Sequence, residues 1–243
     1  MAPPILHRNV TVLGQRVPLP VAVLIASVLT ASILGATLTR NGLPVLQLGV
    51  LIPGLVWSGE VWRLLTWVFF ELNPLNLVFG CLALWWFGGP LARLWGPVRF
   101  LRISLGIVTL SAGLTCLVAL LWPALQGVPY LGIWPLVDAL IIAWASLSPY
   151  STVLVFFVFP AQGRMLIYLT VGMTVVYALL VGISGFIPHL VAEGLMLVYF
   201  RDAGLRRLWL KLRFSGLERK LRHKTSPLRE VGRSQEDRPR WFH

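Results

Sequence analysis

Residues 103–137 read ISLGIVTLSAGLTCLVALLWPALQGVPYLGIWPLV, an apolar run without a charged side chain. A helix crosses the hydrocarbon core of a bilayer with about 20 apolar residues, so this run is too long for one crossing. Trp122-Pro123 and Gly127-Val128-Pro129 interrupt it, because proline removes a helix donor and glycine lowers helix stability. The run therefore predicts two membrane helices, one at 103–121 and one at 130–148.

The composition of the whole chain favours a membrane protein. Of its 243 residues, 57% are hydrophobic and 12% are charged, and the mean hydropathy is +0.78. Soluble domains carry about 25% charged residues, and disordered chains have low hydrophobicity, so the composition argues against both classes. The two cysteines, Cys81 and Cys116, lie in apolar stretches without a Cys or His at a metal-ligand spacing. They predict neither a disulfide framework nor a metal site.

Further uncharged stretches complete a set of six predicted spans. They cover residues 17–39, 72–92, 103–121, 130–148, 164–183 and 187–200. The sequence thus predicts an all-α integral membrane domain at 17–200, preceded by a short segment at 1–16. The stretch 41–59 is also uncharged, but its glycines and prolines favour an irregular or interfacial loop.

The distribution of basic residues predicts the orientation. With a cytoplasmic N-terminus, nineteen of the 21 Lys and Arg residues lie inside, and Arg40 and Arg63 lie outside. Cytoplasmic loops of membrane proteins carry an excess of Lys and Arg, so we expect both termini in the cytoplasm. A multi-pass protein of a bacterial inner membrane fits this pattern.

Most of the basic residues follow the last predicted span. Arg206, Arg207, Lys211 and Arg213 lie among leucines that recur at helical spacing. Segment 201–223 is therefore predicted to be a basic amphipathic helix on the anionic inner leaflet of the bilayer. Residues 224–243, rich in Ser, Pro, Arg and Glu, are predicted to be a disordered basic tail. Lipid binding accounts for this charge, and no nucleic-acid partner is expected.

Four motifs follow one another along the predicted spans. They are Trp62-Arg63-Leu64-Leu65-Thr66, Leu84-Trp85-Trp86-Phe87-Gly88, Gly132-Ile133-Trp134-Pro135 and Pro188-His189-Leu190. In this order they resemble the motifs of the rhomboid superfamily of intramembrane proteins. The resemblance covers residues 58–202 and implies a six-helix rhomboid-like bundle, with Trp62 and Arg63 in the loop after the first span.

The resemblance also implies where a rhomboid protease has its catalytic residues. Such proteases use a serine on the fourth span and a histidine on the sixth, and a second-span histidine and asparagine help to hold the oxyanion. At the matching positions this chain has Trp134, His189, Asn76 and Gly80. An indole supplies one hydrogen-bond donor and no nucleophile, so we expect a pseudoprotease without catalytic residues, cofactor or metal. We expect Trp134 to fill the former site and to donate its N–H group to His189 or Asp138.

Two acidic residues fall inside predicted spans. Asp138 lies four residues after Trp134, and Glu193 lies four residues after His189, so each is one helical turn further along the same face. An ionisable residue at membrane depth is costly and is a functional candidate by default. Asp138, His189 and Glu193 are therefore predicted to form a polar cluster. It either fastens two helices together or takes part in client binding or proton handling.

The loop motif lacks one residue that the resemblance implies. The family usually has a glutamate directly after the position of Leu91, which braces the first loop, and this chain has Ala92-Arg93 there. We expect Glu60 or Glu71 to pair with Arg63 in its place.

The resemblance implies a function as well as a fold. Inactive rhomboids and derlins bind other membrane proteins, so the chain is predicted to be a non-proteolytic binder or adaptor of transmembrane clients. A client helix would enter sideways, between the second and fifth spans. Two alternatives stay open. One is a divergent intramembrane serine endopeptidase, and the other is a proton-coupled transporter that uses Asp138, His189 and Glu193.

Overall fold

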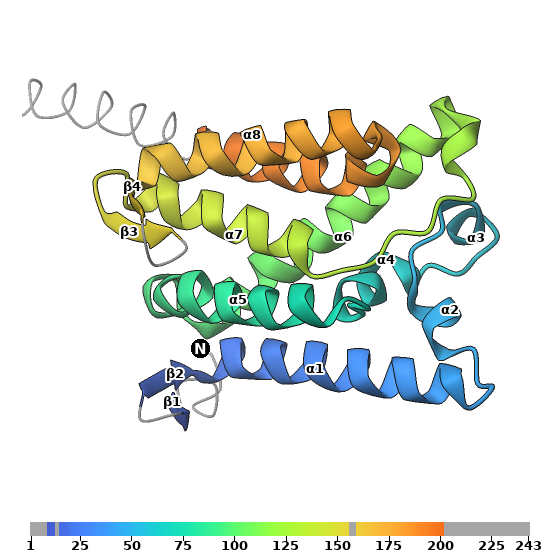
Figure 1. Ribbon diagram of the computed structural model, residues 1–243, viewed down its shortest axis with the longest axis horizontal. Coiled ribbons are helices and arrows are strands. Elements are labelled where there is room, and N and C mark those ends of the chain that lie inside the picture. Colours follow the sequence, from blue (N-terminus) through green and yellow to red (C-terminus); the bar gives the residue numbers. More distant parts are fainter. Residues whose placement is uncertain (1–8, 13–14, 156–158, 202–243) are drawn as a thin grey trace, which may run out of the picture. The chain divides into compact units, whose positions relative to one another are not determined.

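The computed structural model describes residues 9–12, 15–155 and 159–201 (Figure 1). The chain divides into two units, Met1–Phe200 and Arg201–His243. Of the second unit, Arg201 alone is described. The predicted amphipathic helix with Arg206, Arg207, Lys211 and Arg213, and the predicted tail at 224–243, therefore lie outside the described residues.

Five described helices are long and apolar enough to cross a membrane. They are α1 (Leu19–Arg40), α5 (Pro74–Trp95), α6 (Pro97–Leu121), α8 (Gly163–Val181) and the C-terminal helix (Ile183–Arg201). A sixth apolar helix, α7 (Trp134–Leu147), has 14 residues. At 1.5 Å per residue it extends about 21 Å, which is shorter than the hydrocarbon core of a bilayer.

Three helix starts differ by four or more residues from the predicted ranges. The C-terminal helix begins at Ile183 and not at residue 187. Helix α6 begins at Pro97 and not at residue 103. Arg99 and Arg102 lie in its first turns, so the uncharged stretch from which the span was predicted starts only after them. Helix α7 begins at Trp134 and not at residue 130. Before it, Tyr130 pairs with Leu51 in an isolated antiparallel bridge, and Gly132 has a φ of +119°.

The join between α5 and α6 follows from local sequence. The Asn73 side chain caps α5 by accepting hydrogen bonds from the backbone N–H groups of Leu75 (2.9 Å) and Asn76 (3.3 Å). Pro74 occupies the first helical position, where its missing N–H group is no loss. Gly96, with a φ of +78°, then ends α5, and α6 starts at the next residue.

The stretch between α1 and α5 is a loop with short helices. It contains α2 (Val45–Gly49), α3 (Pro53–Trp57), α4 (Arg63–Thr66) and the 3-10 helix η2 (Trp67–Phe69). These short helices lie at the end of the bundle where α5 and α7 begin (Figure 1). A further 3-10 helix, η3 (Pro123–Leu125), follows α6.

Two small antiparallel hairpins accompany the helices. Strands β1 (Asn9–Val12) and β2 (Gln15–Pro18) precede α1, and strands β3 (Thr152–Val155) and β4 (Phe159–Gln162) join α7 to α8. The prediction of an all-α chain did not include these hairpins.

Helix α7 lies at the centre of the Met1–Phe200 unit. It packs against α5, α6 and α8, and α5 also packs against α1. Nine residues of α7 are buried, among them Ala139, Ala143 and Ala145. Small side chains let helices approach closely where lipid provides no hydrophobic drive, which explains why α7 is so closely surrounded.

The start of α8 offers a test of this packing. A Cβ atom on Gly163 would lie 2.4 Å from the carbonyl oxygen of Ser148 and 3.1 Å from the Cα atom of Pro149. Because both contacts are backbone atoms, we expect Gly163→Ala to lower the free energy of unfolding by about 1–3 kcal/mol. Gly172→Ala is the matched control on the same helix, since nothing lies within 4 Å of its Cβ position. Thermal unfolding in detergent would measure both, and equal melting temperatures for the two variants would contradict the packing.

Candidate functional site

A contact between two polar side chains joins α7 to the C-terminal helix. The Nδ1 atom of His189 lies 2.8 Å from Oδ2 of Asp138. The two side chains are mostly enclosed, with 21% of His189 and 11% of Asp138 exposed. A carboxylate on one ring nitrogen holds the imidazole in a fixed orientation and leaves the other nitrogen to face elsewhere. The helical spacing thus brings together two of the three residues of the predicted polar cluster.

The third residue, Glu193, has a different partner. It lies on the C-terminal helix and is 2% exposed, and Thr174 of α8 donates its hydroxyl to Oε1 of Glu193 at 2.6 Å. The other carboxylate oxygen, Oε2, is buried without a hydrogen-bond partner among the described residues. The structure therefore has two neighbouring polar pairs, and sequence reasoning missed Thr174 because nothing in the sequence fixes the rotation of α8.

Trp134 and Ile133 lie beside Gly80 of α5. A Cβ atom on Gly80 of α5 would lie 2.5 Å from Cγ2 of Ile133 and 4.0 Å from Nε1 of Trp134. A side chain at position 80 therefore does not fit while Ile133 and Trp134 occupy this space. The indole N–H group of Trp134 is buried and has no acceptor among the described residues. The predicted hydrogen bond from this group to His189 or Asp138 is absent.

A buried acid, Glu71, lies just before α5. Its backbone N–H group donates to the Ser32 hydroxyl of α1 (2.9 Å), and its Oε1 atom accepts from the backbone N–H group of Asn73 (3.1 Å). A Cβ atom on Gly132 would come within 2.9 Å of Oε2, so this carboxylate lies against the glycine that precedes α7. Asn76, in the first turn of α5, is exposed.

Burial raises the pKa of Glu71 above its usual value of 4.5, because a charged carboxylate loses solvation there. The backbone N–H groups of Asn73 and Leu72 and the Asn76 side chain oppose this shift of the pKa. Sequence reasoning considered Glu71 only as a partner of Arg63. Its place beside Gly132 depends on a contact between distant parts of the chain.

A cavity of about 110 Å³ adjoins His189. Its lining includes Tyr130 and Leu131 from the segment before α7, Pro135 from α7, and Gly185 and Pro188 from the C-terminal helix. Burial raises the pKa of Tyr130 to about 12, with a further contribution from Cys116, so this phenol stays neutral at physiological pH. Asp138 is the one described side chain that hydrogen-bonds His189, and no described hydroxyl or thiol does so.

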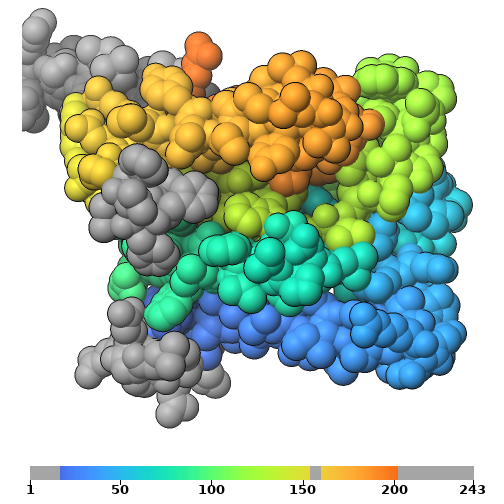
Figure 2. Space-filling view, in the orientation of Figure 1, coloured from blue at the N-terminus to red at the C-terminus, as the bar shows by residue number. Residues whose placement is uncertain are grey.

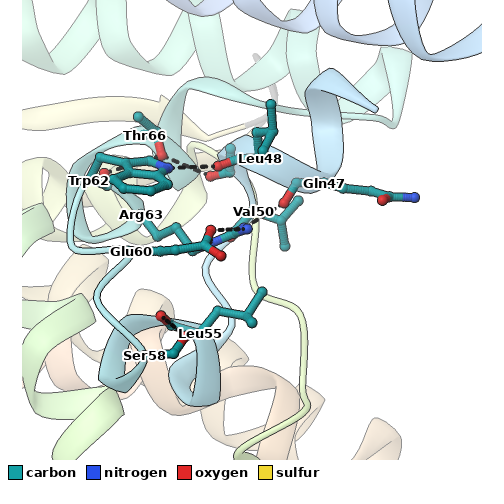
Figure 3. A network of polar contacts seen from close by, with 10 residues as sticks. Gln47, Leu48, Val50, Leu55, Ser58, Glu60, Trp62, Arg63 and Thr66 are labelled. Atoms are coloured by element: carbon teal, nitrogen blue, oxygen red, sulfur yellow. Dashed lines mark hydrogen bonds and ion pairs between the residues drawn. The ribbon is translucent and has the colours of Figure 1, made fainter. Parts of the chain in front are cut away.

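Arg63 organises the loop between α1 and α5 (Figure 3). Its guanidinium group is buried, donates to Glu60 Oε2 at 2.8 Å and also donates to the carbonyl oxygens of Gln47 and Val50. Glu60 therefore takes the place of the missing glutamate, and Glu71 does not. Trp62 adds a hydrogen bond from its indole N–H group to the Leu48 carbonyl at 3.2 Å.

The helices, the buried polar pairs and the loop define a multi-pass intramembrane protein. The sequence model of the Rhomboid domain matches residues 58–207, which is more than half of the chain. The chain therefore belongs to the rhomboid family, and the predicted resemblance is confirmed. No curated protein shows a significant match to the chain.

The arginine network predicts the effect of a conservative change. Lysine has a single ammonium group and cannot serve Glu60 and two carbonyls in the geometry of a guanidinium. We expect Arg63→Lys to lower the free energy of unfolding by about 2–3 kcal/mol, because buried acceptors lose their donor. The control is Arg99→Lys at an exposed position, with an expected change within about 0.5 kcal/mol. Chemical unfolding in mixed micelles would measure both, and a similar small change in each would show that the network contributes little.

The raised pKa of Glu71 predicts a pH dependence of stability. Between pH 4.5 and that raised pKa, the folded protein binds more protons at Glu71 than the unfolded chain does. The stability of the native protein therefore falls as the pH rises through this range. Glu71→Gln keeps an acceptor for Asn73 and removes the titration, so its stability should change less with pH. Unfolding measured from pH 4 to 8 would test this, and parallel curves for the two proteins would refute it.

Proposed function

We propose that the chain is a rhomboid-family protein that binds the transmembrane segments of other proteins without cleaving them. The observation that carries the proposal is the state of the degenerate site. His189 is held by Asp138, and a tryptophan fills the position of the nucleophile. Acyl transfer by this family's mechanism needs a hydroxyl next to the histidine and donors at the oxyanion. Trp134 supplies no hydroxyl, and Gly80 has no side chain that could donate to an oxyanion.

The proposal includes six membrane crossings. Five helices have the length of a span, and α7 would be the sixth. Its 14 residues are surrounded by α5, α6 and α8, so its ends meet protein rather than hydrocarbon, and a shorter helix suffices. The excess of Lys and Arg supports cytoplasmic termini, and a bacterial inner membrane fits that orientation. The basic residues after the last span would bind the anionic inner leaflet.

A groove between α5 and α8 supports a lateral binding site. Both helices pack on α7, and yellow-green atoms of the α7 region are visible between teal α5 and orange α8, set back from both (Figure 2). Trp144 and Ile141 of α7 are partly exposed and pack in one apolar cluster with Phe87 of α5 and Ile167 of α8. Phe87 meets Trp144 edge to face at 5.6 Å between ring centroids. An apolar client helix would cover these side chains.

Helix α8 is weakly enclosed on this side of the bundle. It buries Gly163, Leu166, Thr174 and Ala178, and most of its other side chains are exposed. A helix with so little buried area can shift sideways at a lower cost than α7. The lateral route for a client therefore runs past α8.

A photo-crosslinking experiment in liposomes tests the proposal. The purified protein carries a benzophenone amino acid at Phe87 and is mixed with single-span reporter proteins. We expect crosslinks to intact reporter and no cleaved fragment, because the groove binds a helix and the site lacks a nucleophile. Leu110 on the exposed face of α6 is the matched control position. It should give few crosslinks.

Two outcomes would contradict the proposed function. Equal crosslinking from Phe87 and Leu110 would mean that the groove does not bind clients. Cleavage of a reporter by the native chain and also by Trp134→Ala, but not by a heat-inactivated sample, would show an active peptidase with another nucleophile. Trp134→Ser in the same panel shows whether a hydroxyl at this position is sufficient for cleavage.

A further inference from the structure

We propose that His189, oriented by Asp138, recognises a hydroxyl group on the bound client, that is, a serine or threonine side chain near one end of its membrane segment. This inference rests on the proposed client-binding function and names the chemistry that the site selects. It concerns the free edge of an imidazole beside a cavity.

One ring nitrogen of His189 has no protein partner among the described residues. Nδ1 of His189 is 2.8 Å from Asp138, so in the neutral ring its proton is donated to the carboxylate. Nε2 is then a hydrogen-bond acceptor. No described residue donates to it, and the ring is 21% exposed and lines the cavity of about 110 Å³. The structure thus offers a fixed acceptor at the wall of an open space.

The wall of the cavity is rich in proline. Pro129, Pro135 and Pro188 all line the cavity, and proline has no backbone N–H group. These three residues offer no backbone donor to Nε2. Tyr130 also lines the cavity, and its hydroxyl is buried without a hydrogen-bond partner among the described residues, but it does not hydrogen-bond His189. A donor to Nε2 must therefore come from water or from a ligand. A ligand hydroxyl would form this hydrogen bond inside the cavity, where it is less exposed to solvent than at the protein surface.

The size of the cavity restricts the group that it can hold. Water takes about 30 Å³ of liquid volume, so the cavity has room for a few waters or for one small side chain. Serine and threonine carry a donor hydroxyl on one or two carbons and fit such a space. Lysine and arginine have longer stems and larger polar groups. The volume thus favours a hydroxyl on a short side chain.

The imidazole of His189 is held in place and lies near the start of the C-terminal helix. The ring of Phe186 lies 5.4 Å from that of His189 and stacks on Tyr177 of α8 at 6.0 Å. The imidazole is therefore held by a carboxylate at one edge and lies against an aromatic ring that is itself packed. It lies in the second turn of the C-terminal helix, and the cavity also borders the first turn of α7. A hydroxyl that reaches it belongs to the end of a client span.

The test is a pairwise comparison of isosteric reporters. A single threonine is moved along the ten residues at each end of an otherwise apolar single-span reporter, and each version has a valine twin of the same shape. Binding to the full chain in liposomes is measured by fluorescence energy transfer. At one register we expect the threonine reporter to bind about 3- to 10-fold more tightly than its twin, the effect of one hydrogen bond. His189→Leu should abolish the difference, and Thr109→Val, an exposed change on α6, should preserve it.

A second measurement avoids the risk that His189→Leu fails to fold. The chain has four histidines, and with His7, His223 and His243 replaced by glutamine only His189 remains. The ¹⁵N resonance of Nε2 should move when the threonine reporter binds and stay in place with the valine twin.

The outcomes separate this inference from the proposed function. Binding of both reporters with equal affinity at every register, or an unchanged Nε2 resonance, would overturn the inference and leave the binder function standing. A threonine preference that survives in His189→Leu would also overturn it, because the hydroxyl would then be bound elsewhere. Failure of every reporter to bind would overturn both.

Discussion

The C-terminal helix is fastened to three neighbours within a short stretch of its length. Ser111 of α6 donates to the Pro188 carbonyl at 2.7 Å, Asp138 of α7 contacts His189, and Thr174 of α8 donates to Glu193. Hydrocarbon offers no partner for polar groups, so each of these groups must be satisfied inside the protein. The position of the last helix against α6, α7 and α8 follows from these contacts, and the cavity and the free edge of the imidazole follow from that position.

Much of the membrane domain could be predicted from the sequence, because long uncharged runs and helix breakers are local properties. The predicted and observed bounds of the helices differ where a charged residue or a contact between distant residues determines the structure. Arg99 and Arg102 hid the start of α6, since charges are tolerated in the first turns of a helix at the membrane surface. The extended segment before α7 depends on pairing between Leu51 and Tyr130, residues far apart in the chain. This bridge and the two hairpins involve too few residues to leave a clear periodic pattern in the sequence.

The candidate site was predictable to the extent that it depends on helical spacing. The four-residue interval placed Asp138 one turn from Trp134, and the family resemblance placed His189 at the same depth. Their contact follows from those two facts. The partner of Glu193 and the place of Glu71 were not predictable, because they depend on the rotation of α8 and on the path of the loop before α5. Glycine at position 132 is a residual signal, since Glu71 lies where a Cβ atom would be.

The packing around Trp134 has an evolutionary consequence. A serine at position 134 would leave the volume of the indole ring unfilled, and its neighbour Gly80 would still offer no side chain there. A larger residue at position 80 would place its Cβ atom 2.5 Å from Cγ2 of Ile133 unless that side chain moved as well. A change at position 134, at position 80 or at Ile133 is therefore unfavourable when it is made alone. A lineage with this packing therefore accepts other changes around position 134 more easily than a single change to serine there.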